Sequence, residues 1–182
     1  MKEISSEKTK IQIKGLAYYQ IIGGIIGIGF VIWFVSQTTF FSVLKILLLG
    51  VGVGLYSFSI YCGYQLLNST NKESFRLSAI NQALQILSFT LLGFSYKYIA
   101  GVEFIIGMNL TSETLFTFNF AFFSSEFQIS VGDEDKDIAK MGINIVPILI
   151  MYFINKLEQK IKDNQSVFDI SESKILDDDL IE

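Results

Sequence analysis

The side chains that could do chemistry in this chain are few, and the missing ones exclude most catalytic mechanisms. The 182 residues contain no histidine and a single cysteine, Cys62. Without histidine, neither a Ser-His-Asp triad, nor a Cys-His pair, nor a histidine-liganded metal can be built. Cys62 lies within a long apolar run, where burial disfavours the reactive thiolate. We therefore expect a non-enzymatic protein that uses no cofactor and no metal.

One acidic stretch has the spacing of metal ligands. Asp133, Asp135 and Asp137 alternate as in the opening of a calcium-binding loop. That loop needs glycine at its sixth position and glutamate at its twelfth, where this chain has Ile138 and Asn144. The stretch is therefore interpreted as a solvated acidic turn. The sequence also has no phosphate-binding glycine loop and no basic patch with interleaved aromatic residues, so we expect no nucleic-acid partner.

Amide and hydroxyl side chains recur at helical spacing in the middle of the chain. Asn81, Gln85 and Ser88 follow an i, i+4, i+7 pattern, and Asn144 lies in a later apolar segment. Such groups need partners inside a membrane, and hydrogen bonds between helices are their usual use. A second interpretation makes the same four residues the lining of a polar path for a small solute.

Small residues four positions apart form three pairs along the first two apolar segments. The pairs are Gly23 with Gly27, Gly50 with Gly54, and Ser59 with Gly63. Each pair lines one helix face and lets two helix backbones approach closely. We expect them to pack the first two helices of one chain together, with the first pair against the second. The alternative is a face for dimerisation.

Phenylalanine recurs at every second position in one later segment, at Phe116, Phe118, Phe120 and Phe122. As a strand, this segment would have one dense aromatic face. That face could dock a partner subunit or lipid headgroups, or it could pack on the helix ends or a second strand of the same chain. Turns at 111–113 and 124–126 would divide the surrounding region into three strands.

Four apolar runs must position these residues. Leu16–Val35 contains no charged residue, and as a helix it would be about 30 Å long, the thickness of bilayer hydrocarbon. Further spans are predicted at Val43–Leu67, Leu77–Tyr96 and Ile138–Ile154. Alternation with a period of two follows the third span and is typical of strands. We therefore predict a four-helix transmembrane bundle with a small extracytoplasmic antiparallel β layer between helices 3 and 4.

Charge sets the expected topology. Four spans would place Lys2, Lys8, Lys10, Lys14 and most later basic residues on the side of both termini, which the positive-inside rule makes cytoplasmic. The predicted organisation is a cytoplasmic segment 1–14, transmembrane helices within 15–101, a β-rich insertion 102–137, a fourth helix within 138–157 and an acidic, disordered cytoplasmic tail 158–182.

These features predict an integral protein of a plasma or bacterial inner membrane that acts through contacts. The first hypothesis is an accessory, assembly or interaction subunit, as a homo-oligomer or with a partner membrane protein. The alternative is a small channel or transporter with an amide-lined path between helices 3 and 4. A membrane enzyme is the least supported, because only Glu103 and the acidic turn could supply its chemistry.

Overall fold

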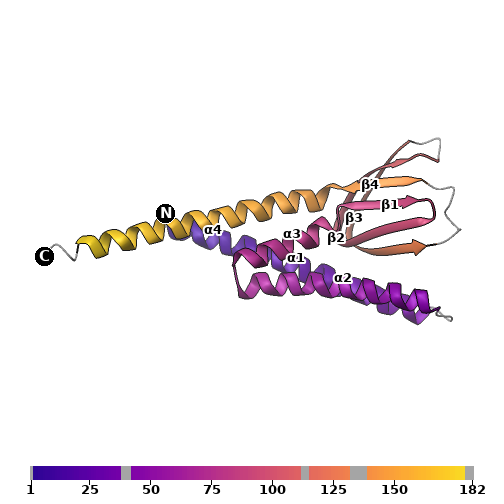
Figure 1. Cartoon of the computed structure of the whole chain (residues 1–182), viewed down its shortest axis with the longest axis horizontal. Helices are drawn as coiled ribbons and strands as arrows, with labels where there is room; N and C mark the ends of the chain where they lie inside the picture. Colours follow the sequence, from indigo (N-terminus) through magenta and orange to yellow (C-terminus); the bar gives the residue numbers. More distant parts are fainter. Residues whose placement is uncertain (1, 38–41, 112–114, 132–138, 179–182) are drawn as a thin grey trace.

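The computed structural model describes residues 2–37, 42–111, 115–131 and 139–178 (Figure 1). Three helices come first, a set of antiparallel strands follows, and a long helix ends the chain. The elements in order are α1 (Lys2–Gln37), α2 (Val43–Asn68), α3 (Lys72–Ala83), β1 (Leu87–Leu91), β2 (Phe94–Asn109), β3 (Phe116–Val131), β4 (Lys140–Asn144) and α4 (Ile145–Asp178).

Helices α1 and α2 form a long antiparallel hairpin (Figure 1). Their apolar portions, Glu7–Gln37 and Val43–Asn68, have 31 and 26 residues. At 1.5 Å per residue they measure about 46 and 39 Å, more than the hydrocarbon thickness of a bilayer. Among the described helices these two are long and apolar enough to cross a membrane, so two of the four predicted spans are supported.

The predicted third span, Leu77–Tyr96, is wrong. Helix α3 is capped by Asn71, whose side chain accepts a hydrogen bond from the Ser74 amide at 2.9 Å, and it ends at Ala83. The remainder forms β1 and the start of β2. The two strands meet at Leu92 and Gly93, which have positive φ angles of 52° and 82°. Two adjacent residues with positive φ are what a tight type I′ hairpin requires.

The predicted fourth span is also wrong, and with it the four-helix transmembrane bundle. Its first part is strand β4, and α4 begins only at Ile145. Pro147 lies in the first turn of α4, where its missing amide hydrogen costs nothing. The observed order of three helices, a sheet and a fourth helix is a different fold, and a four-pass chain is not supported. Helix α4 continues through Asp178, in the region predicted as a disordered tail.

The strands form one curled antiparallel sheet in the order β1-β4-β2-β3. Strand β2 pairs along its whole length with β3, from Phe94 opposite Val131 to Met108 opposite Phe116. Its other edge pairs first with β1 and then with β4, and β1 and β4 also pair with each other. This closed set of pairings is possible only because β2 bends, so the sheet wraps around its own interior.

The bend lies at Gly101, where the β2–β3 register shifts by a bulge. Gly101 has a φ of 135°, and a Cβ there would lie 2.5 Å from the Tyr19 hydroxyl of α1. Both constraints require glycine. The predicted β region is thus present, but the predicted turn at 124–126 is wrong, because β3 continues through it. Residues 112–114 of the other predicted turn lie outside the described residues.

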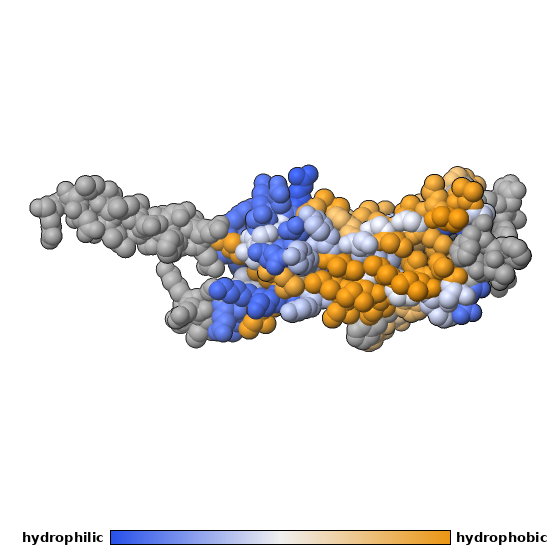
Figure 2. Space-filling view, turned by 90° about the horizontal axis from the view of Figure 1, so that it is seen from below, coloured by the Kyte–Doolittle hydropathy of each residue, from blue (hydrophilic) through white to orange (hydrophobic). Residues whose placement is uncertain are grey.

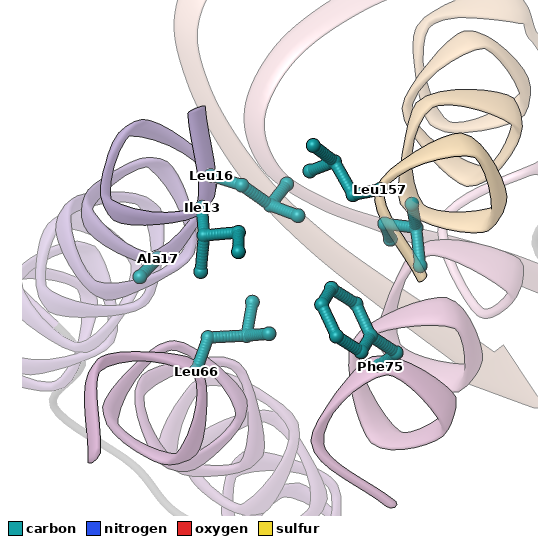
Figure 3. Packing of buried hydrophobic residues seen from close by; sticks show 7 residues of the cluster. Ile13, Leu16, Ala17, Leu66, Phe75 and Leu157 are labelled. Atoms are coloured by element: carbon teal, nitrogen blue, oxygen red, sulfur yellow. The ribbon is translucent and has the colours of Figure 1, made fainter. Parts of the chain in front are cut away.

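All four helices meet in one apolar cluster, which joins the last turn of α2 and the first turn of α3 to the first half of α1 and of α4 (Figure 3). Leu16 of α1, Leu66 of α2, Phe75 of α3 and Leu157 of α4 are buried there. A second cluster, containing Tyr56, Tyr98 and Ala100, fixes β2 to the hairpin. The sheet is therefore held along the side of α1 and α2.

Candidate functional site

The two faces of the sheet have opposite chemical character. On the inner face, Glu103 lies opposite Ala121, Ile105 opposite Asn119 and Gly107 opposite Thr117. On the outer face the cross-strand pairs are Phe104 with Phe120, Ile106 with Phe118 and Met108 with Phe116. Because side chains alternate across a strand, this register directs polar groups inwards and apolar groups outwards.

The inner face encloses a cavity of about 470 Å³, here called the sheet cavity. All four strands contribute to its wall. Its polar lining includes Ser88, Thr90, Lys97, Thr117, Asn119, Glu126, Gln128 and Lys140. Apolar side chains such as Phe89 and Ile105 complete the lining, so the cavity has a mixed wall. A cavity of this size with several polar groups can hold water or a small solute.

A charged group that we call the Lys97 cluster lies at one wall of the cavity. The Lys97 Nζ atom lies 3.4 Å from Glu103 Oε2 and 2.5 Å from Glu126 Oε2. The Glu103 side chain is only 3% exposed, and it also accepts hydrogen bonds from Asn119 Nδ2 at 2.6 Å and Ser124 Oγ at 3.3 Å. One cation and two neutral donors thus stabilise this buried carboxylate. The cluster carries a net charge of −1, and its carboxylates could attract a cation.

The sequence alone did not predict this cluster. Glu103 was considered only as a possible source of enzyme chemistry, and Lys97 was not selected. The spacing of Lys97 and Glu103 could have indicated the ion pair. They are six positions apart, and an even separation places both side chains on the same face of a strand.

The outer face of the sheet is exposed and apolar. We call it the apolar sheet face, and it consists of Phe104, Ile106, Met108, Phe116, Phe118, Phe120, Phe122, Met141 and Ile143. The four predicted phenylalanines of β3 are 59%, 71%, 56% and 69% exposed in chain order. The Phe120 ring lies edge to face with the rings of Phe104 and Phe122. The phenylalanines therefore do not pack on the helix ends.

Asn81 lies in a buried network between the hairpin, α3 and β2. Its Nδ2 donates to Gln20 Oε1 at 3.0 Å and to Ser59 Oγ at 3.1 Å, and its Oδ1 accepts from the Tyr98 hydroxyl at 3.3 Å. Gln85 donates to the Asn81 carbonyl and accepts from the Ala100 amide.

The other two residues of the predicted polar path lie elsewhere. Ser88 lines the sheet cavity, and its hydroxyl donates to the Gly142 carbonyl at 3.4 Å. Asn144 lies at the junction of β4 and α4, where its Oδ1 accepts from the amides of Phe104 and Val146. Asn81 and Gln85 are thus brought together, whereas Ser88 and Asn144 are not part of their network. A solute-conducting role for the four residues stays a prediction.

We predict opposite effects for two neighbouring amides of α3. Asn81→Leu would leave the buried Gln20 Oε1 without its donor and remove one of the hydrogen bonds of Ser59 and of Tyr98, which lowers the free energy of unfolding by about 1–3 kcal/mol. Gln82 is also fully buried, but neither of its amide atoms has a partner in the described structure. Gln82→Met should therefore be neutral or stabilising. Reversible unfolding in mixed micelles measures both; equal destabilisation would contradict the assigned network.

The predicted small residues of α1 and α2 contact both the neighbouring helix and strand β2. A Cβ at Gly23 would lie 2.5 Å from the Ala100 carbonyl oxygen of β2, and one at Gly27 would overlap the Tyr56 ring. Gly63 is equally close to the Ala17 carbonyl oxygen, and the Ser59 hydroxyl donates to the Gln20 carbonyl. The Gly23 face therefore receives the sheet as well as α2.

The second glycine pair does not take the predicted position. A Cβ at Gly50 or Gly54 would meet nothing within 4 Å, so these residues do not pack against the face of Gly23 and Gly27. Gly52, which the sequence analysis did not select, is the close contact instead, with Phe127 of β3.

Comparisons with protein-family models, with curated proteins and with solved structures find no match. Within the described residues, no three or more cysteine, aspartate or glutamate side chains gather as metal ligands. The acidic stretch around Asp135 lies outside the described residues. The sheet cavity and the apolar sheet face are therefore the two features from which a function can be argued.

Proposed function

We propose that this chain is a non-enzymatic membrane subunit that acts through contacts, with its hairpin and its sheet at the same depth of the bilayer. The observation that carries the proposal is a broad apolar surface shared by both. Figure 2 shows apolar residues over the half of the molecule that contains the hairpin loop and the sheet, and polar residues toward the chain termini.

The exposure of the hairpin supports membrane insertion over a soluble core. Only 22% of the most apolar window of α1 and 17% of that of α2 is buried. Ile32, Trp33 and Leu47 are each at least 60% exposed. A core helix of a soluble protein would bury such side chains, and leaving them in water costs about 1.5–3 kcal/mol each.

The sheet supports the same location. In β-sheets whose outer face contacts lipid, inward-facing polar residues alternate with outward-facing apolar residues along each strand. The sheet is fixed along the hairpin by the contacts of Ala100 with Gly23 and of Phe127 with Gly52, so it lies beside the apolar helices. This replaces the predicted extracytoplasmic layer beyond the helix ends.

Charge supports the orientation. Lys8, Lys14, Arg76, Lys156 and Lys162 lie close in sequence to Ile13, Phe75 and Leu157 of the four-helix apolar cluster. Both chain termini lie on the side of the molecule away from the sheet (Figure 1). Lys45 is near the hairpin loop at the other end. The positive-inside rule then places both termini in the cytoplasm.

Contact is the proposed mode of action because large exposed apolar surfaces commonly mark interaction sites, and this surface covers both the hairpin and the sheet. The sheet cavity favours one other function, passage of a small hydrophilic solute. Ion pairs at membrane depth commonly mark such paths. This path would run inside the sheet, past Lys97, and not along Asn81 and Gln85.

Native mass spectrometry of the full chain in lipid nanodiscs tests the proposal. We expect the protein to need detergent for extraction and to appear as a stable oligomer or with a co-purifying membrane partner. A monomer with no partner would contradict a contact function. Solute flux into vesicles that contain such a monomer would support the passage function instead.

A further inference from the structure

We propose that the sheet cavity binds a small zwitterionic ligand, in which a short linker joins an ammonium group to an acidic group. The proposal goes beyond the contact function. It depends on the pairing of the four strands and not on the depth of the sheet in the bilayer. The cavity volume of about 470 Å³ lies within the usual range of small-molecule sites, about 300–1,000 Å³.

The wall of the cavity carries opposite charges at two separate levels. At one level, the Lys97 cluster has two carboxylates for one ammonium group, so it has an excess of one negative charge. At the other level is Lys140 of β4, which has no ion pair within the described part of the chain. The charges of the wall therefore cancel in total but not locally.

The strand register places both charged groups on the inner face of the sheet. Lys140 lies opposite Thr90 of β1 and Asn109 of β2, and both of these residues line the cavity. Glu126 of β3 contacts the Lys97 ammonium group, which also lies at the cavity wall. Because residues directly opposite each other share a face of the sheet, Lys140 and Glu126 border the same space.

The two levels are close enough for one small molecule to reach both. Through Thr90, Lys140 is level with Ser95 of β2, whereas Glu126 is level with Ile99. Four residues of a strand separate these levels, which corresponds to about 13 Å. The long side chains of lysine and glutamate can extend over part of this distance, so the remaining gap suits a ligand with a short linker.

A simple ion matches only one of the two levels. A cation would be attracted to Glu126 but would leave Lys140 without a partner, and an anion would do the opposite. A zwitterion places its ammonium group beside the carboxylate and its acidic group beside the lysine, so both protein charges gain a charge-assisted hydrogen bond. Gln128, at the inner-face position between the two levels, supplies a neutral group that can orient the ligand.

Both binding groups are accessible to a ligand. Lys140 is exposed, and the Glu126 side chain is 46% exposed. Glu103 of the same cluster is only 3% exposed and already accepts hydrogen bonds from Asn119 and Ser124. We therefore assign the binding of the ammonium group to Glu126, whereas Glu103 positions Lys97.

Protection of a cysteine in the cavity tests the proposal with the full chain in lipid nanodiscs. In the Cys62→Ala background, Thr117→Cys reports on the cavity, and Lys72→Cys at the exposed start of α3 is the control. In phosphatidylglycerol nanodiscs, β-alanine or glycerophosphoethanolamine should slow the reaction of Thr117→Cys with N-ethylmaleimide at least fivefold. The single-charge probes ethanolamine and dimethyl phosphate should slow it less than twofold, and Lys72→Cys should not respond.

The lipid composition distinguishes the source of the zwitterion. Protection in nanodiscs that contain phosphatidylethanolamine, with no added solute, would assign a lipid headgroup, and protection by an added zwitterion alone would assign a soluble ligand. Either result supports the proposal. Unchanged reaction rates with every zwitterion, or equal protection by ethanolamine or dimethyl phosphate, would overturn it.

Two charge substitutions test the assigned groups. Lys140→Gln and Glu126→Gln should each raise the concentration for half-maximal protection at least tenfold, because each removes one of the two charge partners. Lys45→Gln removes an exposed lysine of α2 and should leave this concentration unchanged. Circular dichroism verifies the strands in every variant. An equal loss in Lys45→Gln, or no loss in the two cavity variants, would contradict the assignment.

Discussion

Replacing Lys97 by methionine is expected to lower the free energy of unfolding by about 3–5 kcal/mol, the usual cost of removing one partner from a buried ion pair. Glu103 would keep the hydrogen bonds from Asn119 and Ser124 but lose its only cation among the described residues. Its side chain is 3% exposed, so the carboxylate would lose its cation while staying largely shielded from solvent. Methionine keeps the length of the lysine stem, which limits the loss to charge.

Glu126→Gln is the matched control. Its carboxylate also contacts Lys97, but the side chain is 46% exposed, and exposed pairs contribute about 0–1 kcal/mol. Urea titration in mixed micelles, followed by circular dichroism of the strands, compares the two variants. If Lys97→Met were no less stable than Glu126→Gln, the buried carboxylate would not depend on Lys97.

The sequence predicted the parts of the fold whose pattern is long and uniform. Leu16–Val35 and Val43–Leu67 are apolar and uncharged at their centres over lengths that only helices use, and both lie in observed helices. Alternation around Phe104 and Phe118 likewise predicted strands that lie in β2 and β3. In each case the pattern extends over enough residues to distinguish a helix from a strand.

The third and fourth spans failed because short apolar runs do not distinguish strands from helices. From Leu87 to Leu91, apolar residues alternate with Ser88 and Thr90, but this pattern is only five residues long and follows a helix directly. The turn that separates β1 from β2 is Leu92-Gly93, without the usual asparagine or aspartate. A run of apolar residues therefore concealed a hairpin.

The candidate site could be predicted only in part. The phenylalanines of β3 were identified, because alternation places them on one face whatever that face contacts. The Lys97 cluster was not, because Lys97 and Glu126 are brought together by a register that no local pattern specifies. Alternation also does not show which face of a sheet points inward. In this protein the polar face points inward.

The measurement that tests the membrane depth of the sheet most directly compares two adjacent positions of β3. Thr117 faces the sheet cavity and Phe118 the apolar sheet face, at the same depth. We would place single cysteines at each position in the Cys62→Ala background and follow their reaction with N-ethylmaleimide in lipid vesicles. The reaction needs a thiolate, which forms in water and not in hydrocarbon.

We expect Thr117→Cys to react at least tenfold faster than Phe118→Cys, and the difference to disappear after unfolding in sodium dodecyl sulfate. Reaction of Phe118→Cys in vesicles at the same rate as Thr117→Cys would place the apolar sheet face in water and contradict the proposed membrane depth of the sheet.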